Sequence, residues 1–444
     1  MKPGKRYLLF LLTVILAFNY TDRFALGMVL EDLKRDLLLT DSQLGLLSGI
    51  AFALFYSLMG LPIARLADRE NRVTLIAVTA ALWGVAVAVC GVATSFLHLL
   101  LIRVGIGIGE SGCVPPSLSL ITEYFSREER PRAVSAYMQG ISLSFFIGYL
   151  AAGWINELFG WRVMFLLIGL PGLALSVLTA TTLKDPRPRV PRSSTILLSH
   201  RSLLSTSKSL WNITTFRRLL YSCAVNWFFT YGTLQWAPAF FERSFGTSSG
   251  ILGTIFALIF GVSSIAGTYL GGAFATRYAA KNEALQLRGM AVVTCVSGVL
   301  MLFVYLKSLS PNTYLAFTWL GLSNLAASMV NGPQFAVLQT VIPPPMRATS
   351  TALVYLFGNL IGIGLGPWGA GALSDALGPW LHQDSLRYAM AILCPGFIWS
   401  AYYLWEAAKT ASCDLEAAQW HAQLTSDTTP PQSDHPEMRA GLPL

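Results

Sequence analysis

Long apolar runs, separated by short polar segments, occupy most of this chain. An α-helix rises about 1.5 Å per residue, so about 20 apolar residues cross a hydrocarbon core roughly 30 Å thick. Runs of this length recur and predict membrane-spanning helices. Twelve spans are expected, at residues 7–30, 42–64, 73–93, 97–122, 131–155, 162–182, 216–241, 249–272, 288–306, 312–340, 348–373 and 386–408. The pattern therefore predicts an all-α membrane protein.

Composition and the placement of positive charge agree with this prediction. Only 12% of the residues are charged and 54% are hydrophobic, whereas soluble domains carry about 25% charged residues. Of the 31 lysines and arginines, 23 fall in the two tails and in alternate loops, and six fall in the opposite loops. Cytoplasmic loops are enriched in these residues, so both termini are expected in the cytoplasm. The net charge of +8 thus reflects topology and gives no reason to expect a nucleic-acid partner.

The sequence offers no pattern for a metal, a cofactor or a catalytic set. Its six cysteines and five histidines are scattered, without the spacing of a metal or redox pair. The run Gly105-Ile106-Gly107-Ile108-Gly109 lies inside an apolar helix without a preceding strand, which excludes a dinucleotide-binding loop. No Ser/His/Asp set or phosphate loop is found elsewhere. We therefore expect that the protein is not an enzyme and binds neither a metal nor a cofactor.

The chain also contains an internal repeat. With a shift of 208 residues, Leu44-Gly45 aligns with Leu252-Gly253. Further along, where the shift has grown to 218 residues, Phe159-Gly160 corresponds to Leu377-Gly378. The repeat predicts two six-helix halves in parallel arrangement, which in transporters bind substrate between them and rock to alternate access. Four regions follow: an N-terminal half at 1–182, a cytoplasmic linker at 183–215, a C-terminal half at 216–410 and a disordered cytoplasmic tail at 411–444.

Four charged residues lie inside the apolar runs: Asp22, Arg23, Arg103 and Glu110. Charges at membrane depth are costly and usually mark a substrate or proton path. Asp22 lies ~12 Å from the outer end of the first span and Arg103 ~9 Å from the outer end of the fourth, which predicts an ion pair between them. Glu110 follows Arg103 by nearly two helical turns, on the same face and ~10 Å deeper.

Several segments carry recognisable motifs: Asn19-Tyr20-x-Asp22-Arg23, Ala64-Arg65-Leu66-Ala67-Asp68-Arg69-Glu70-Asn71-Arg72, Arg103-x-Gly105-x-Gly107-x-Gly109-Glu110 and Asn359-x-x-Gly362-x-Gly364-x-Gly366-Pro367. The second resembles the cytoplasmic signature loop of the major facilitator superfamily, with Asn71 where glycine is commonest. Together they resemble the spinster-like branch of that superfamily over about residues 1–408, and the short termini resemble its bacterial members. The resemblance implies the major facilitator fold in a bacterial inner membrane. It also implies lipid-type transport, which in animal members is associated with sphingosine phosphate and lysophospholipids and in some with protons.

Roles for the candidate site follow from the charges and from this resemblance. Arg103 is expected to hold an anionic or zwitterionic head group through its guanidinium fork, and Asp22 and Glu110 are expected to bind substrate and carry protons. The alternative is a purely structural Asp22–Arg103 pair. Arg23 is expected to extend to the outer interface. Further candidate substrate-binding residues, some of which would otherwise only pack, are Asn19, Tyr20, Tyr231, Gln235, Trp236, Asn331 and Asn359.

The signature loop predicts a conformational latch. Asp68 lies between the second and third spans and is expected to pair with a cytoplasmic arginine such as Arg132 or to cap a helix. Arg69 and Arg72 belong to the same latch, which would hold the cytoplasmic side closed. The alternative is a solvated loop that stabilises nothing measurable.

The leading functional hypothesis is a monomeric secondary transporter that moves a lysolipid- or sphingolipid-like amphiphile by alternating access, linked to protons. A second hypothesis is a carrier of a small organic anion such as a sugar acid. A third is a membrane receptor that binds lipid without moving it, against which the deep carboxylates argue.

Overall fold

The computed structural model describes residues 4–186, 200–279, 282–343 and 346–427, and within these ranges the regular structure is entirely helical. The N-terminal part contains α1 (Lys5–Met28), α2 (Leu30–Leu37), α3 (Asp41–Ser48), α4 (Ile50–Arg69), α5 (Arg72–Cys90), α6 (Phe96–Glu110), α7 (Val114–Tyr124) and α8 (Arg130–Thr182). The remainder contains α9 (His200–Asn212), α10 (Thr214–Phe245), α11 (Ser249–Tyr278), α12 (Glu283–Tyr305), α13 (Thr313–Val341), α14 (Arg347–Phe357), the π-helix η2 (Gly358–Leu365), α15 (Gly366–Leu381), the short 3₁₀ helix η3 (His382–Asp384), α16 (Ser385–Leu393) and α17 (Gly396–Asp427).

The twelve predicted spans all coincide with helices in the described residues. Eight helical segments are long and apolar enough to cross a membrane, and two of them, 132–182 and 349–416, each contain two predicted spans. Helices α10 and α13 provide the two others. Residues 411–427 were predicted to be disordered, but α17 continues through them to Asp427. Alanine, leucine, glutamate and glutamine favour the helix there, although the segment is polar.

Several spans are interrupted. The fourth breaks between Glu110 and Val114, and Pro115 and Pro116 then occupy the first turn of α7, as expected where a proline cannot donate a backbone hydrogen bond. Gly160 separates the fifth and sixth spans inside α8, with φ at 79°, a left-handed conformation that glycine adopts readily. The eleventh span contains η2, and π-helical turns often mark functional sites.

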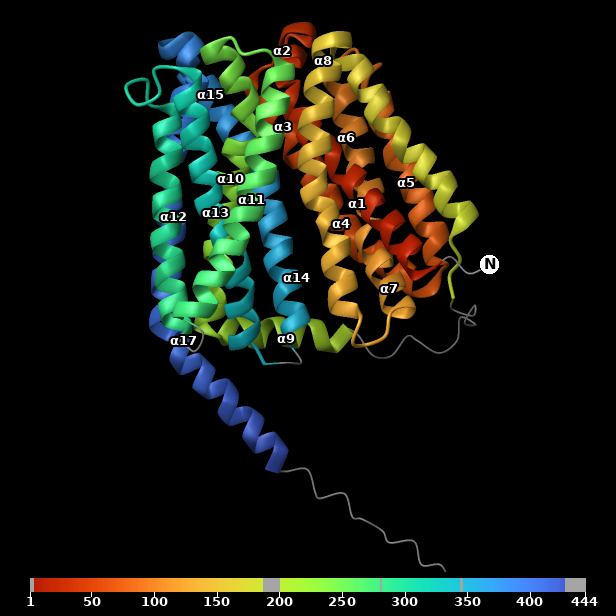
Figure 1. The fold of residues 1–444 in the computed structure, drawn as a ribbon, viewed down its shortest axis with the longest axis vertical. Coiled ribbons are helices and arrows are strands. Elements are labelled where there is room, and N and C mark those ends of the chain that lie inside the picture. Colours follow the sequence, from red (N-terminus) through yellow and green to blue (C-terminus); the bar gives the residue numbers. More distant parts are fainter. Residues whose placement is uncertain (1–3, 187–199, 280–281, 344–345, 428–444) are drawn as a thin grey trace, which may run out of the picture.

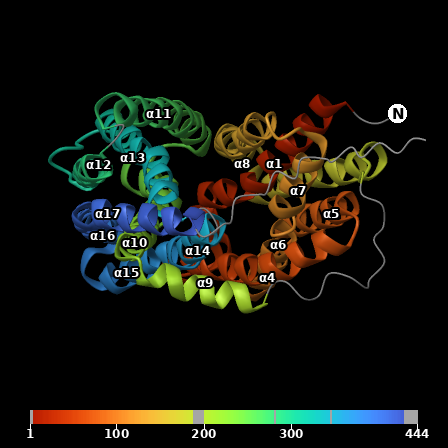
Figure 2. The same ribbon diagram turned by 90° about the horizontal axis from the view of Figure 1, so that it is seen from below.

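The helices form two bundles that lie side by side (Figures 1 and 2). Helices α1 to α8, coloured red to yellow, form one bundle, and α10 to α17, coloured green to blue, form the other. Helix α9 runs across the bottom of Figure 1 and contacts α10 and α14. We call the opposite face, at the top of Figure 1, the outer face, in line with the predicted topology.

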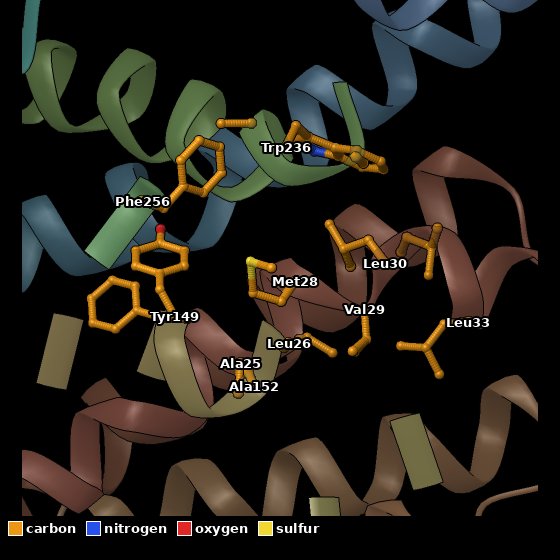
Figure 3. Packing of buried hydrophobic residues seen from close by; sticks show 14 of the residues in the cluster. Ala25, Leu26, Met28, Val29, Leu30, Leu33, Tyr149, Ala152, Trp236 and Phe256 are labelled. Carbon is orange, nitrogen blue, oxygen red and sulfur yellow. The ribbon is translucent and has the colours of Figure 1, made fainter. Parts of the chain in front are cut away.

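An aromatic core connects the bundles towards the outer face. Tyr149 of α8 lies 5.4 Å from Phe24 of α1 and 5.5 Å from Phe256 of α11, measured between ring centroids. Figure 3 shows Tyr149 facing Phe256, with Trp236 of α10 nearby and the apolar end of α1 beside Ala152. Because side chains of both bundles share this core, their outer parts are packed against each other.

Arg72 is fully buried at the start of α5, inside the N-terminal bundle. Its guanidinium donates to both carboxylate oxygens of Asp185, at 2.6 and 3.1 Å, and to Ser119 of α7. Asp185 also accepts from the Arg72 backbone N–H, so it caps α5. Arg72 was predicted to belong to the latch, without a named partner. The structure gives it a partner just after the end of α8, at the start of the predicted linker, so this pair does not join the two halves.

Asp185→Ala should destabilise the protein by about 3 kcal/mol, because it leaves the buried Arg72 with only the half-exposed Glu123 carboxylate, 3.7 Å away, as a counter-charge. Thermal unfolding in detergent measures this effect. The matched control is Asp36→Ala, whose ion pair with Arg162 is 43% exposed on both sides and should contribute less than about 1 kcal/mol. Equal losses of stability in the two variants would contradict a structural role for Asp185.

Candidate functional site

The four charges inside the spans form two ion pairs between α1 and α6. Arg103 Nη1 lies 2.7 Å from Asp22 Oδ2, and the two side chains are 2% and 1% exposed. Arg103 Nε also donates to the carbonyl of Leu47, at 3.2 Å. The predicted Asp22–Arg103 pair is confirmed, and its geometry leaves little of Arg103 free for a substrate.

The side chain of Arg23 does not point in the expected direction. It points inwards, and its Nη2 and Nε donate to Glu110 Oε2 at 2.7 and 3.1 Å. Its guanidinium also lies over aromatic rings, 4.0 Å from Tyr20, 4.6 Å from Phe52 and 4.9 Å from Tyr56. The buried carboxylate and the aromatic faces stabilise the guanidinium of Arg23 more than contact with water at the outer interface would. The prediction that Arg23 extends outwards is therefore wrong.

Some polar atoms beside these pairs have no hydrogen-bond partner in the described residues. They are Asp22 Oδ1, Glu110 Oε1 and both terminal atoms of the Asn19 amide, and all are buried. Asp22 and Glu110 belong to the two ion pairs between α1 and α6. Unpaired buried acceptors are costly, and protonation of either carboxyl group would lower that cost.

A small cavity between the halves reaches the exposed edge of Arg23. Its lining is Tyr20, Arg23, Phe24, Ser48 and Phe52 from the N-terminal half and Tyr231, Leu234, Gln235, Ile363 and Pro367 from the C-terminal half. Arg23 is 11% exposed, while Glu110 is fully buried behind it. Gln235 Nε2 donates to the backbone carbonyl of Arg23 at 3.3 Å and so links the halves. Arg23 is thus the cation that faces this cavity.

The other predicted binding residues divide into two groups. Tyr20, Tyr231 and Gln235 line the cavity. Trp236, Asn331 and Asn359 do not line this cavity. Trp236 is fully buried and donates to the Pro367 carbonyl at 2.8 Å. Asn331 is exposed, and Asn359 lies in η2. Sequence reasoning missed Phe52 and Tyr56. Their spacing of one helical turn places both on one face of α4, but the sequence does not show that this face meets Arg23.

The latch stays a prediction. The side chain of Asp68 lies outside the described residues. Arg69 and Arg132 are exposed, and within the described part of the chain neither has an ion pair or a side-chain hydrogen bond.

Comparisons with known proteins agree with this architecture. The family description "Major Facilitator Superfamily" matches residues 12–367. An MFS-type efflux pump of Mycolicibacterium smegmatis is 28% identical over 387 residues, which cover 86% of this chain and 87% of the pump. The hexuronate transporter of Bacillus subtilis is 26% identical over 412 residues, which cover 86% and 90% of the two chains.

A solved structure is similar over nearly the whole chain. It is a bacterial homologue of the human lysosomal transporter spinster, in an inward-facing and unoccupied conformation. Its TM-score is 0.79 at 26% identity, and the match covers 93% of this chain and 99% of that one. This likeness supports the spinster-like resemblance that the motifs of α1 and α6 predicted. With two helical bundles and a family match across most of its length, this chain belongs to the Major Facilitator Superfamily of multi-pass membrane transporters.

Proposed function

We propose that this transporter is linked to protons and carries an anionic amphiphile, with Arg23 as the residue that binds its head group. The observation that carries this proposal is the Arg23–Glu110 pair at the wall of the cavity between the halves. Arg23 cannot bind a second anion fully while Glu110 occupies one edge of its guanidinium fork.

The pair couples protons to substrate through competition for Arg23. A proton on Glu110 removes its negative charge and frees the guanidinium for the substrate's anionic group. Loss of that proton restores the Arg23–Glu110 pair and expels the anion. The affinities for proton and substrate are then linked reciprocally. The neighbouring Asp22 carboxyl can share the proton, while Arg103 remains fixed by Asp22 and Leu47.

The lining supports an amphiphile with a small anionic group. Phe24, Phe52, Leu234 and Ile363 provide apolar surface beside a single facing cation, a lining typical of ligand sites with few polar groups. The alternative substrate, a sugar acid, is supported by Tyr20, Ser48, Tyr231 and Gln235, which offer partners for hydroxyl groups. It is also supported by the similarity to a hexuronate transporter. Membership of a transporter family argues against the non-transporting receptor.

Arg23→Ala should weaken substrate binding by roughly 10- to 100-fold, because a charge-assisted hydrogen bond is lost. Arg23→Lys should recover only part of this loss, because the planar fork is missing. Binding to purified protein is measured for a lysophospholipid, sphingosine phosphate and glucuronate, and the tightest ligand identifies the class. Arg162→Ala, at an exposed pair on the outer face, is the control. Unchanged binding in Arg23→Ala would remove Arg23 from the site.

Glu110→Gln should abolish accumulation driven by a pH gradient and preserve exchange of labelled substrate, because the amide cannot exchange a proton. Proteoliposomes with an imposed gradient measure both activities. Glu129→Gln is the matched control, since Glu129 is half exposed and paired with Lys5. If Glu110→Gln accumulates substrate as the wild type does, Glu110 is not the proton carrier.

A further inference from the structure

On the outer face, a carboxylate of one half holds the start of a helix in the other. Asp375 of α15 accepts hydrogen bonds from the first residues of α3: from Asp41 N at 3.1 Å, Ser42 N at 2.7 Å and Ser42 Oγ at 2.5 Å. Helix N-termini present free N–H groups and a partial positive charge, so a carboxylate is stabilising there.

A second contact between the halves on this face joins α8 to α11. It has the same arrangement, but the half that supplies the carboxylate and the half that supplies the helix are exchanged. Glu157 Oε2 of α8 accepts from Gly250 N at the start of α11, at 2.5 Å. Its neighbour Asn156 donates to Ser249 Oγ at 3.3 Å. Here the N-terminal half supplies the carboxylate and the C-terminal half supplies the helix.

The internal repeat relates the two contacts. The offset of 208 that aligns the second and eighth spans places Ser42 on Gly250, and the offset that aligns Phe159-Gly160 with Leu377-Gly378 places Glu157 on Asp375. Gly371 and Gly153 are also related by this offset, and each lies against the backbone of the opposite half. A Cβ on Gly371 would lie 2.2 Å from the Asp41 carbonyl, and a Cβ on the equivalent Gly153 would lie 2.4 Å from the Ser249 carbonyl. Two interactions related by the repeat are therefore built in the same way.

The two contacts differ in charge. Asp41 is 1% exposed, and Arg243 of α10 donates to both of its carboxylate oxygens at 2.8 Å. Lys34 lies 2.7 Å from the same carboxylate. Ser249 occupies the equivalent position in α11 and carries no charge. Arg243 also pairs with Glu31, and Arg35 with Glu242, across the halves. The α3–α15 contact is thus reinforced by ion pairs that the α8–α11 contact lacks in the described residues.

We infer that Asp375 and Glu157 are a repeat-related pair of outer-gate residues, each capping a helix of the opposite half while the outer face is closed. Both sets of hydrogen bonds join rigid bundles and survive only within about 3.5 Å. Rotation of the halves to open the outer face therefore breaks them. The inference rests on transport by alternating access and is independent of the substrate.

The test measures access from the outer side. Ser48 lines the central cavity, so Ser48→Cys reports on opening. The background carries Cys295→Ser and Cys413→Ser, because the other four cysteines are buried. Asp375→Ala and Glu157→Ala should each raise the rate at which a membrane-impermeant maleimide labels the Ser48→Cys thiol about tenfold, since a charge-assisted bond is lost. The double variant should raise it by about the product. Protease digestion of the C-terminal tail identifies the outer side.

Asp36→Ala is the control, because Asp36 pairs with Trp161 and Arg162 of its own half on the same face, and it should not change labelling. Rates in both single variants equal to this control would overturn the inference. A second measurement applies if the alanine variants fold poorly. A disulfide between Ser42→Cys and Asp375→Cys should block transport reversibly, and transport that persists in the cross-linked protein would also overturn it.

Discussion

The central site depends on charge compensation in two buried ion pairs that lie side by side between α1 and α6. Four full charges lie where the permittivity is low, and removal of any one leaves its partner uncompensated. The pairs are also coupled through one aromatic ring, because Phe52 lies 4.6 Å from the Arg23 guanidinium and 5.3 Å from that of Arg103. A proton or an anion that disturbs one pair therefore acts on the other, and on the α1–α6 contact that supports the cavity.

The electrostatic interactions fall into two sets with different functions. Arg72–Asp185 and Arg103–Asp22 connect segments on the N-terminal side of the molecule and do not join the two halves. Asp41–Arg243 and the two helix caps join the halves. By the inference made above, these contacts break when the outer face opens. The contacts between the halves are of a different kind, because glycines there let backbones meet directly.

The sequence predicted the fold and part of the site. Hydrophobic run lengths located the spans, and helical depth alone paired Asp22 with Arg103. The direction of Arg23 was not predictable, because a long side chain near an interface can reach either water or a partner, and the position of Glu110 in space decides between them. Asp185 was missed because it lies 113 residues from Arg72. The helix caps made by Asp375 and Glu157 could not be predicted from the internal repeat alone. Their identification also required the structure, which shows which helix ends of the two halves meet.

The close approach of α3 to α15 and of α8 to α11 also determines from which monolayer the central cavity can be reached. At both contacts backbone lies directly on backbone, with no room for a methyl group at Gly371 or Gly153. A hydrocarbon chain is wider than a methyl group, so it cannot pass between these helices from the outer leaflet. An amphiphile of the kind proposed above would therefore reach the cavity, in this conformation, from the face that carries α9. The two glycines without side chains at these helix crossings close the opposite route.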